Sequence, residues 1–131
     1  MSYAGDLSPS EAHELLLARP DAVLVDCRTN AEWSFVGVPV VAGTRFVEWT
    51  RWPDGSPNPD FVAQAGEGLE TEQPVVMLCR SGGRSVAAAH ALTDAGFSEV
   101  YNVLEGFEGD VDAAGHRSGG WRGAGLPWQQ K

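Results

Sequence analysis

The fold is decided by residues 75–84, which read Val75-Val76-Met77-Leu78-Cys79-Arg80-Ser81-Gly82-Gly83-Arg84. The first four residues are apolar without polar alternation, which is typical of a strand covered on both faces in a parallel sheet. Residues 85–95 are rich in alanine and stop before Gly96, so they predict a helix that ends at a glycine. The stretch therefore predicts a buried strand, a short loop and a helix.

The segments on either side continue this alternation. Ser8, Pro9 and Glu11 are helix-start signals and predict a helix over about 9–18. The other predicted elements are a strand at 22–25, a short helix at 31–33 capped by Thr29 or Asn30, a short strand within 40–47, a proline-rich loop at 51–60, a strand at 100–104 and, from Glu105, a wrap over the domain. We expect one α/β domain, residues 1–131, with a mainly parallel central sheet and helices on both faces.

Composition and charge exclude several functional classes. Hydrophobic residues make up 43% of the chain and charged residues 21%, as in an ordinary globular protein. The net charge of −9 argues against binding nucleic acid through a broad basic face. The sequence has no apolar run of the ~20 residues that span a bilayer and no export signal at its start. We expect a cytoplasmic protein that binds neither nucleic acid nor membrane.

The two cysteines, Cys27 and Cys79, cannot form a disulfide framework, so we expect both to be reduced thiols. Their spacing does not match a zinc site. Glu108, Asp110 and Asp112 hint at calcium, but the glycine and the final glutamate of an EF-hand loop are missing. We therefore expect no metal site.

Cys79 stands beyond the carboxyl end of a strand, where ligands gather in sheets of this type. A cysteine reacts as its thiolate, and its pKa falls beside cations or at a helix N-terminus. Arg80 and Arg84 supply cations, while Gly82 and Gly83 allow successive N–H groups to point into one anion-binding concavity. The following helix adds a partial charge of roughly +0.5 at its N-terminus. These neighbours favour a reactive thiolate over a cysteine that only packs.

Three separated motifs resemble those of the rhodanese-homology family. The first is Asp26-Cys27-Arg28 with Glu32-Trp33 and Gly37, similar to the family's Asp-x-Arg, Glu-Trp and Gly. The second is Cys79 to Arg84, similar to its Cys-x-x-Gly-x-Arg loop. The third is Asn102 to Phe107 with Trp121 and Gly125-Leu126-Pro127, similar to its ending. Because the motifs occur in the family's order and cover nearly the whole chain, the protein resembles a single-domain rhodanese.

The resemblance implies a rhodanese-like fold and a two-step sulfur transfer without a cofactor. The Cys79 thiolate would take sulfur from a small anionic donor such as thiosulfate, and the persulfide would pass it to cyanide, a thiol or a protein acceptor. The substrate-binding residues that it implies are Arg80 and Arg84, which would orient the donor, and the backbone of Ser81, Gly82, Gly83 and Ser85, which would stabilise charge on the sulfur.

Three other functions are weighed against this one. Cysteine phosphatases use a longer loop with five residues between cysteine and arginine, whereas four separate Cys79 from Arg84 here. A binding or regulatory module that kept the fold and lost catalysis is disfavoured by the presence of Cys79 with both arginines, and a domain that delivers sulfur to one protein partner is an open alternative. In a redox thiol protein, Cys27 would resolve an oxidised Cys79, but we favour Cys27 as a small side chain within its motif.

The remaining candidates have structural interpretations. Asp26, Arg28 and Glu32 are expected to support the fold, through a salt bridge or hydrogen bonds that involve Glu32 or nearby backbone. Trp49 and Trp52 lie in the loop that extends to Asp60, and they either shape a substrate pocket or cover the core. The stretch from Asp110 to Gly120 is expected to be a solvated loop, in which His116 could face the active site.

Overall fold

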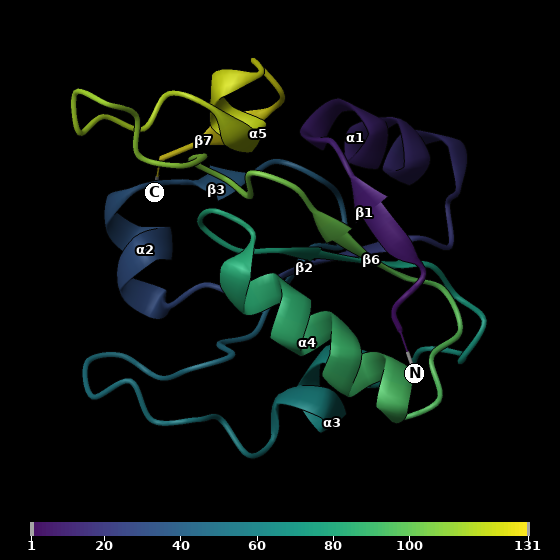
Figure 1. The fold of residues 1–131 in the computed structure, drawn as a ribbon. Coiled ribbons are helices and arrows are strands. Elements are labelled where there is room, and N and C mark those ends of the chain that lie inside the picture. Colours follow the sequence, from purple (N-terminus) through teal and green to yellow (C-terminus); the bar gives the residue numbers. More distant parts are fainter. Residues whose placement is uncertain (1, 131) are drawn as a thin grey trace.

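A parallel sheet forms the centre of the protein (Figure 1). The computed structural model describes residues 2–130, and within them five strands pair in the order β1-β6-β5-β2-β4. The elements along the chain are β1 (Gly5–Leu7), α1 (Pro9–Ala18), β2 (Val23–Asp26), α2 (Asn30–Phe35), β3 (Val38–Pro39), β4 (Arg45–Phe46), α3 (Phe61–Gly66), β5 (Val75–Leu78), α4 (Gly83–Asp94), β6 (Val100–Val103), α5 (Gly120–Gly123) and β7 (Trp128–Gln129).

Helices cover both faces of this sheet, as the apolar strand sequences predict. In the central strand β5, Val75 and Met77 belong to the core on the side of α3 and α4, while Val76 and Leu78 belong to the core on the side of α1 and α5. Figure 1 shows these two helix pairs on opposite sides of the strands. The prediction of an α/β fold with a mainly parallel sheet is confirmed.

Local sequence signals set the starts of the first two helices. The Ser8 hydroxyl oxygen accepts a hydrogen bond from the Glu11 N–H, and the Glu11 carboxylate accepts one from the Ser8 N–H, which completes a capping box. Thr29 and Glu32 form the same kind of capping box at the start of α2. Of the two candidates for the cap, Thr29 and Asn30, the cap residue is therefore Thr29. Each device satisfies N–H groups that a helix start leaves without partners.

Several short elements differ from the sequence-based expectations. The strand expected within 40–47 is β4, which has two residues and pairs with β2. The preceding strand β3 lies outside the central sheet and pairs with β7 in a separate antiparallel ladder. The edge strand β1 and the helix α3 were not predicted, because each is too short to show a periodic pattern. None of the helices within residues 2–130 is long and apolar enough to cross a membrane.

The C-terminal segment wraps over the domain, as predicted. Trp121 in α5 is fully buried and packs edge to face against the His13 ring of α1, with the two ring centres 5.4 Å apart. Its indole N–H donates to the Pro127 carbonyl oxygen at 2.8 Å. The wrap therefore covers the α1 side of the sheet and brings β7 beside β3.

Candidate active site

The candidate site lies at the carboxyl edge of the sheet, where β2 and β5 end together. Asp26 and Leu78 are register partners at the last positions of these strands. The Cys27 N–H then donates to the Leu78 carbonyl oxygen at 2.8 Å, which carries the pairing one step further. Because neighbouring strands lie about 4.8 Å apart, the next residues along each strand, Cys27 and Cys79, are brought side by side.

The Cys79 sulfur is surrounded by hydrogen-bond donors. The Gly82 N–H donates to it at 3.1 Å, and the Ser85 hydroxyl oxygen lies 3.2 Å away. Gly82 has a φ of 105°, a conformation that the glycine permits and that directs its N–H toward the sulfur. Gly83 begins α4, so the helix N-terminus also faces the thiol.

These contacts favour the ionised form of Cys79. The hydrogen bond from the Cys27 thiol lowers the pKa of Cys79 most, and hydrogen bonds from the backbone N–H groups of Ser85 and Gly82 add to it. They outweigh burial, which opposes the charge, and bring the pKa from its ordinary value to about 5. At neutral pH the group is therefore a thiolate.

The pKa of Cys27 is shifted in the opposite direction. Its hydrogen bond to Cys79, together with complete burial, raises the pKa of Cys27 well above the ordinary value. Cys27 therefore keeps its proton and donates a hydrogen bond to the Cys79 thiolate. We expected only a small packing residue at this position, but the register of β2 and β5 gives it a contact with the reactive sulfur.

The two arginines of the loop have different surroundings. Arg84 donates two hydrogen bonds to the Glu32 carboxylate, at 2.7 and 2.9 Å, so a carboxylate already balances its charge. Arg80 is exposed, and within residues 2–130 no salt bridge to it is found. Arg80 is thus the more available cation for an external anion.

Replacing Glu32 with glutamine is expected to strengthen the positive field at Cys79. Glutamine is isosteric and still completes the capping box with Thr29, but it no longer neutralises Arg84. We expect the rate of Cys79 alkylation by iodoacetate, relative to neutral iodoacetamide, to rise about two- to fivefold at low ionic strength. An unchanged ratio would show that Glu32 does not limit the charge of Arg84.

Asp26 and Arg28 form a fully buried ion pair beside the site. Arg28 donates to both carboxylate oxygens of Asp26, at 2.9 and 2.6 Å, and to the Gly37 carbonyl oxygen at 2.8 Å. Its guanidinium carbon lies 4.2 Å from the centre of the Phe107 ring. Of the two further partners that the sequence offered, nearby backbone joins this network through Gly37, whereas Glu32 pairs with Arg84 instead. The pair links strand β2 to the segments around it.

A tight turn after β6 holds the loop that carries Cys79. The Phe107 N–H donates to the Cys79 carbonyl oxygen at 2.7 Å, and the Glu108 N–H donates to the Arg80 carbonyl oxygen at 2.9 Å. Gly106 has a φ of 58° and lies so close to the loop that an added Cβ would be 2.6 Å from the Arg80 carbonyl carbon. The turn therefore fixes the backbone on which the thiol is mounted.

A groove of about 470 Å³ lies beside the loop and has an apolar wall. Arg80 and Arg84 line one part of it, and Phe35, 83% exposed, and Trp52, 63% exposed, line another. Trp49, from the same loop as Trp52, instead packs edge to face on the core residue Phe61 at 5.0 Å. The two interpretations of this loop thus apply to different tryptophans: Trp49 covers the core and Trp52 borders the groove.

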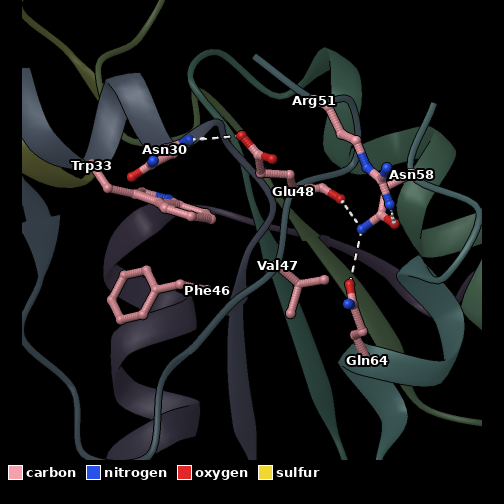
Figure 2. A pocket seen from close by; sticks show the side chains of 8 residues that line it. All are labelled: Asn30, Trp33, Phe46, Val47, Glu48, Arg51, Asn58 and Gln64. Carbon is pink, nitrogen blue, oxygen red and sulfur yellow. Dashed lines mark hydrogen bonds between the residues drawn. The ribbon is translucent and has the colours of Figure 1, made fainter. Parts of the chain in front are cut away.

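A second pocket, of about 520 Å³, opens between α2 and the segment that leads to α3 (Figure 2). Its lining residues are Asn30, Trp33, Phe46, Val47, Glu48, Arg51, Asn58 and Gln64. Figure 2 shows the Asn58 amide between the Glu48 backbone and the Gln64 side chain, to which it donates at 2.8 and 2.9 Å. These bonds anchor the loop that contains Trp49 and Trp52.

The stretch from Asp110 to Gly120 forms its own turn. Asp112 accepts backbone hydrogen bonds from Ala114 and His116, both at 2.9 Å, and Val111 bridges to Arg117. The Asp112 carboxylate therefore serves the turn, and His116 is exposed.

Sequence reasoning gave no role at the site to two polar residues, Asn102 and Asp6. The Ser85 hydroxyl donates to the Asn102 side-chain oxygen, and the Asn102 amide donates to Asp6 at 3.0 Å. The signal was an amide at a core-facing position of the otherwise apolar strand β6, where a buried polar group needs partners. Asp6 lies on β1, which the sequence did not predict.

Comparisons with known proteins agree with this architecture. The profile of the family described as "Rhodanese-like domain" matches residues 8–113. An uncharacterised protein of Rickettsia conorii is 32% identical over 127 residues, covering 95% of this chain and 96% of its own. A thiosulfate sulfurtransferase of Stutzerimonas stutzeri is 32% identical over 102 residues, covering 78% and 80%.

A solved structure extends the similarity to the whole fold. The crystal structure of Rv0390 from M. tuberculosis has a TM-score of 0.91 and 50% sequence identity, with 99% of this chain and 100% of that chain covered. The similarity thus includes the strand, loop and helix from which the candidate site is built.

Proposed function

This chain belongs to the rhodanese-like domain family, and on that premise we propose that it is a sulfurtransferase that carries sulfane sulfur as a persulfide on Cys79. The observation that carries the proposal is the surroundings of the Cys79 sulfur. The Cys27 thiol and the Gly82 N–H donate to it, and its pKa is about 5. A thiolate at neutral pH is the nucleophile that this chemistry requires.

The proposed reaction has two substitution steps at sulfur. The Cys79 thiolate attacks the outer sulfur of thiosulfate; a Cys79–sulfur bond forms, the sulfur–sulfur bond of the donor breaks, and sulfite leaves with its electron pair. An acceptor thiolate or cyanide then attacks the terminal sulfur of the persulfide, and the Cys79 thiolate leaves. The backbone N–H groups of the loop stabilise the negative charge in both steps.

The charges of the loop favour a small anion as the sulfur donor. Arg80 is exposed beside the thiol and attracts a small anion, while Arg84 is held at the helix start by Glu32, which offsets its charge. No cofactor is required by these steps. We place the reaction in the cytoplasm, because a reducing compartment keeps Cys27 and Cys79 as thiols.

The test is to incubate the full chain with thiosulfate, remove the excess and measure the intact mass. We expect a gain of one sulfur atom, which peptide mapping locates on Cys79 and which cyanide removes as thiocyanate. The initial loading rate should rise as the pH increases through about 5 and level off above it, since the thiolate fraction follows the pKa. A protein that gains no sulfur, or gains it on Cys27, would contradict the proposal.

A second candidate, sulfur delivery to a protein or another large acceptor, is favoured by the groove beside the loop. Its volume of about 470 Å³ is larger than thiosulfate needs, and the exposed aromatic rings of Phe35 and Trp52 border it. Exposed aromatic side chains next to a cation are common in surfaces that bind other molecules. In this version the chemistry on Cys79 is unchanged and only the acceptor differs.

A further inference from the structure

A chain of hydrogen bonds leads from Cys79 to the edge of the sheet. The Cys79 sulfur lies 3.2 Å from the Ser85 hydroxyl, which donates to the Asn102 side-chain oxygen. The Asn102 amide nitrogen donates to an Asp6 carboxylate oxygen at 3.0 Å. Ser85 and Asn102 are buried, whereas Asp6 is exposed on β1. The chain thus connects the thiol in the site to the surface on the other side of β6.

Strand register explains why these residues meet. Asn102 on β6 is the register partner of Asp6 on β1 and of Met77 on β5. Met77 belongs to the core beneath α4, whose first turn carries Ser85. Asn102 therefore occupies a core-facing position, and its burial is tolerated because both ends of its amide have partners.

The Asn102 amide has only one orientation that suits both partners. The Asp6 carboxylate accepts hydrogen bonds but cannot donate, so the Asn102 nitrogen must face Asp6. The Tyr3 hydroxyl donates to the same Asp6 oxygen at 2.8 Å. As a result, the Asn102 oxygen is directed at Ser85 and must receive its hydrogen bond from the Ser85 hydroxyl.

Ser85 has a single hydroxyl proton and two acceptors that compete for it. It can donate to the Asn102 oxygen or to the Cys79 thiolate, but not to both. If the proton turned to the thiolate, the buried Asn102 oxygen would lose its partner, which carries a free-energy cost. The Ser85 side chain can therefore stabilise the thiolate only by breaking its bond to Asn102.

We propose that Asn102, oriented by Asp6, holds the Ser85 hydroxyl away from Cys79 and so keeps the thiolate less hydrogen-bonded and more nucleophilic. Asn102 and Asp6 are thereby positioning residues for the nucleophile. The inference rests on the proposed function, in which Cys79 is that nucleophile. It follows the general behaviour of thiolates, whose nucleophilicity increases with their basicity.

The other ionisable groups near the thiol come from separate elements. Cys27 and Asp26 act from the end of β2, and Arg84 acts from α4 together with its partner Glu32 from α2. None of them contacts Asn102 or Asp6 through a hydrogen bond found within residues 2–130. Changes at Asn102 and Asp6 therefore leave these groups in place.

The test follows the absorbance of the thiolate in the full chain as the pH is raised. The step at lower pH reports the ionisation of Cys79, because the pKa of Cys27 is raised. Asn102→Leu removes the competing oxygen, so the pKa of Cys79 should fall by about one unit as Ser85 turns to the sulfur. Ser85→Ala should have little effect in the native chain, yet raise the pKa by about one unit in the Asn102→Leu chain. This dependence of one substitution on the other is not expected if Asn102 only packs.

Exposed Asp6 offers a second route if Asn102→Leu fails to fold. In Asp6→Ala the Asn102 amide is free to reverse and donate to Ser85, so the pKa of Cys79 should again fall. Asp6→Asn is the matched control, because it removes the charge but keeps the acceptor oxygen, which Tyr3 holds in place. It should titrate like the native chain.

The proposal is overturned if Ser85→Ala raises the pKa equally with and without Asn102, or if Asp6→Ala and Asp6→Asn titrate alike. The titration needs no sulfur donor, so its result is independent of whether the protein transfers sulfur. Intact-mass loading with thiosulfate, measured on the same samples, separates failure of this inference from failure of the proposed function.

Discussion

Replacing Cys79 with serine is expected to abolish sulfur loading and to lower thiocyanate formation by about three orders of magnitude or more. A serine hydroxyl fits the same position, but it does not ionise near neutral pH and cannot form a persulfide. The fold should survive, because serine is close in size to cysteine and can accept the hydrogen bonds from Cys27 and Gly82. Intact mass after incubation with thiosulfate and the rate of thiocyanate release are the measurements.

Cys27 provides the matched controls for this prediction. Cys27→Ser keeps a donor beside the Cys79 sulfur and should still load one sulfur atom. Cys27→Ala removes the contact that lowers the pKa of Cys79 most, so loading should become slower below neutral pH and recover at higher pH. If both Cys27 variants lost turnover at every pH, Cys27 would instead have a chemical role, as in a redox thiol protein.

Arg28→Met is expected to destabilise the protein by about 3–5 kcal/mol. The substitution leaves the Asp26 carboxylate buried without its cation and removes the donor to the Gly37 carbonyl oxygen. The side chains of Asp26 and Arg28 are both fully buried, so water cannot replace the lost contacts. Urea unfolding, followed by tryptophan fluorescence, measures the change.

Arg19 provides the control for this effect. It forms an ion pair with Asp21 in which both side chains are more than 40% exposed, so Arg19→Met should cost less than about 1 kcal/mol. Adding Asp26→Leu to Arg28→Met should recover part of the loss, because it removes the uncompensated charge. Equal costs for Arg28→Met and Arg19→Met would contradict the importance of the buried pair.

The sequence predicted the elements whose signal is local. The apolar run in β5, the glycine-rich loop and the alanine-rich helix α4 are contiguous, and so the position of Cys79 at the end of a strand follows from them. The caps at Ser8 and Thr29 are likewise encoded within four residues. Strand β1 has three residues and one neighbouring strand, so its position depends on pairing with β6 rather than on its own pattern.

What the sequence did not reveal depends on strand order. Cys27 contacts Cys79 because β2 lies next to β5, and Asn102 meets Asp6 because β6 lies next to β1. Nothing in the separate segments specifies those neighbours. The partner of Glu32 was missed for a related reason: the cap at Thr29 sets the direction of α2, and that direction turns the carboxylate toward Arg84.

The close approach of Gly106 to the backbone of the cysteine loop affects how mutational scans of this protein should be interpreted. Any other residue at position 106 must push the loop aside, since its Cβ would overlap the backbone of Cys79 and Arg80. A screen scored only by turnover would rank this position with the nucleophile itself, although glycine has no side chain to contribute. Scoring protein abundance alongside turnover would separate residues that shape the loop from those that react.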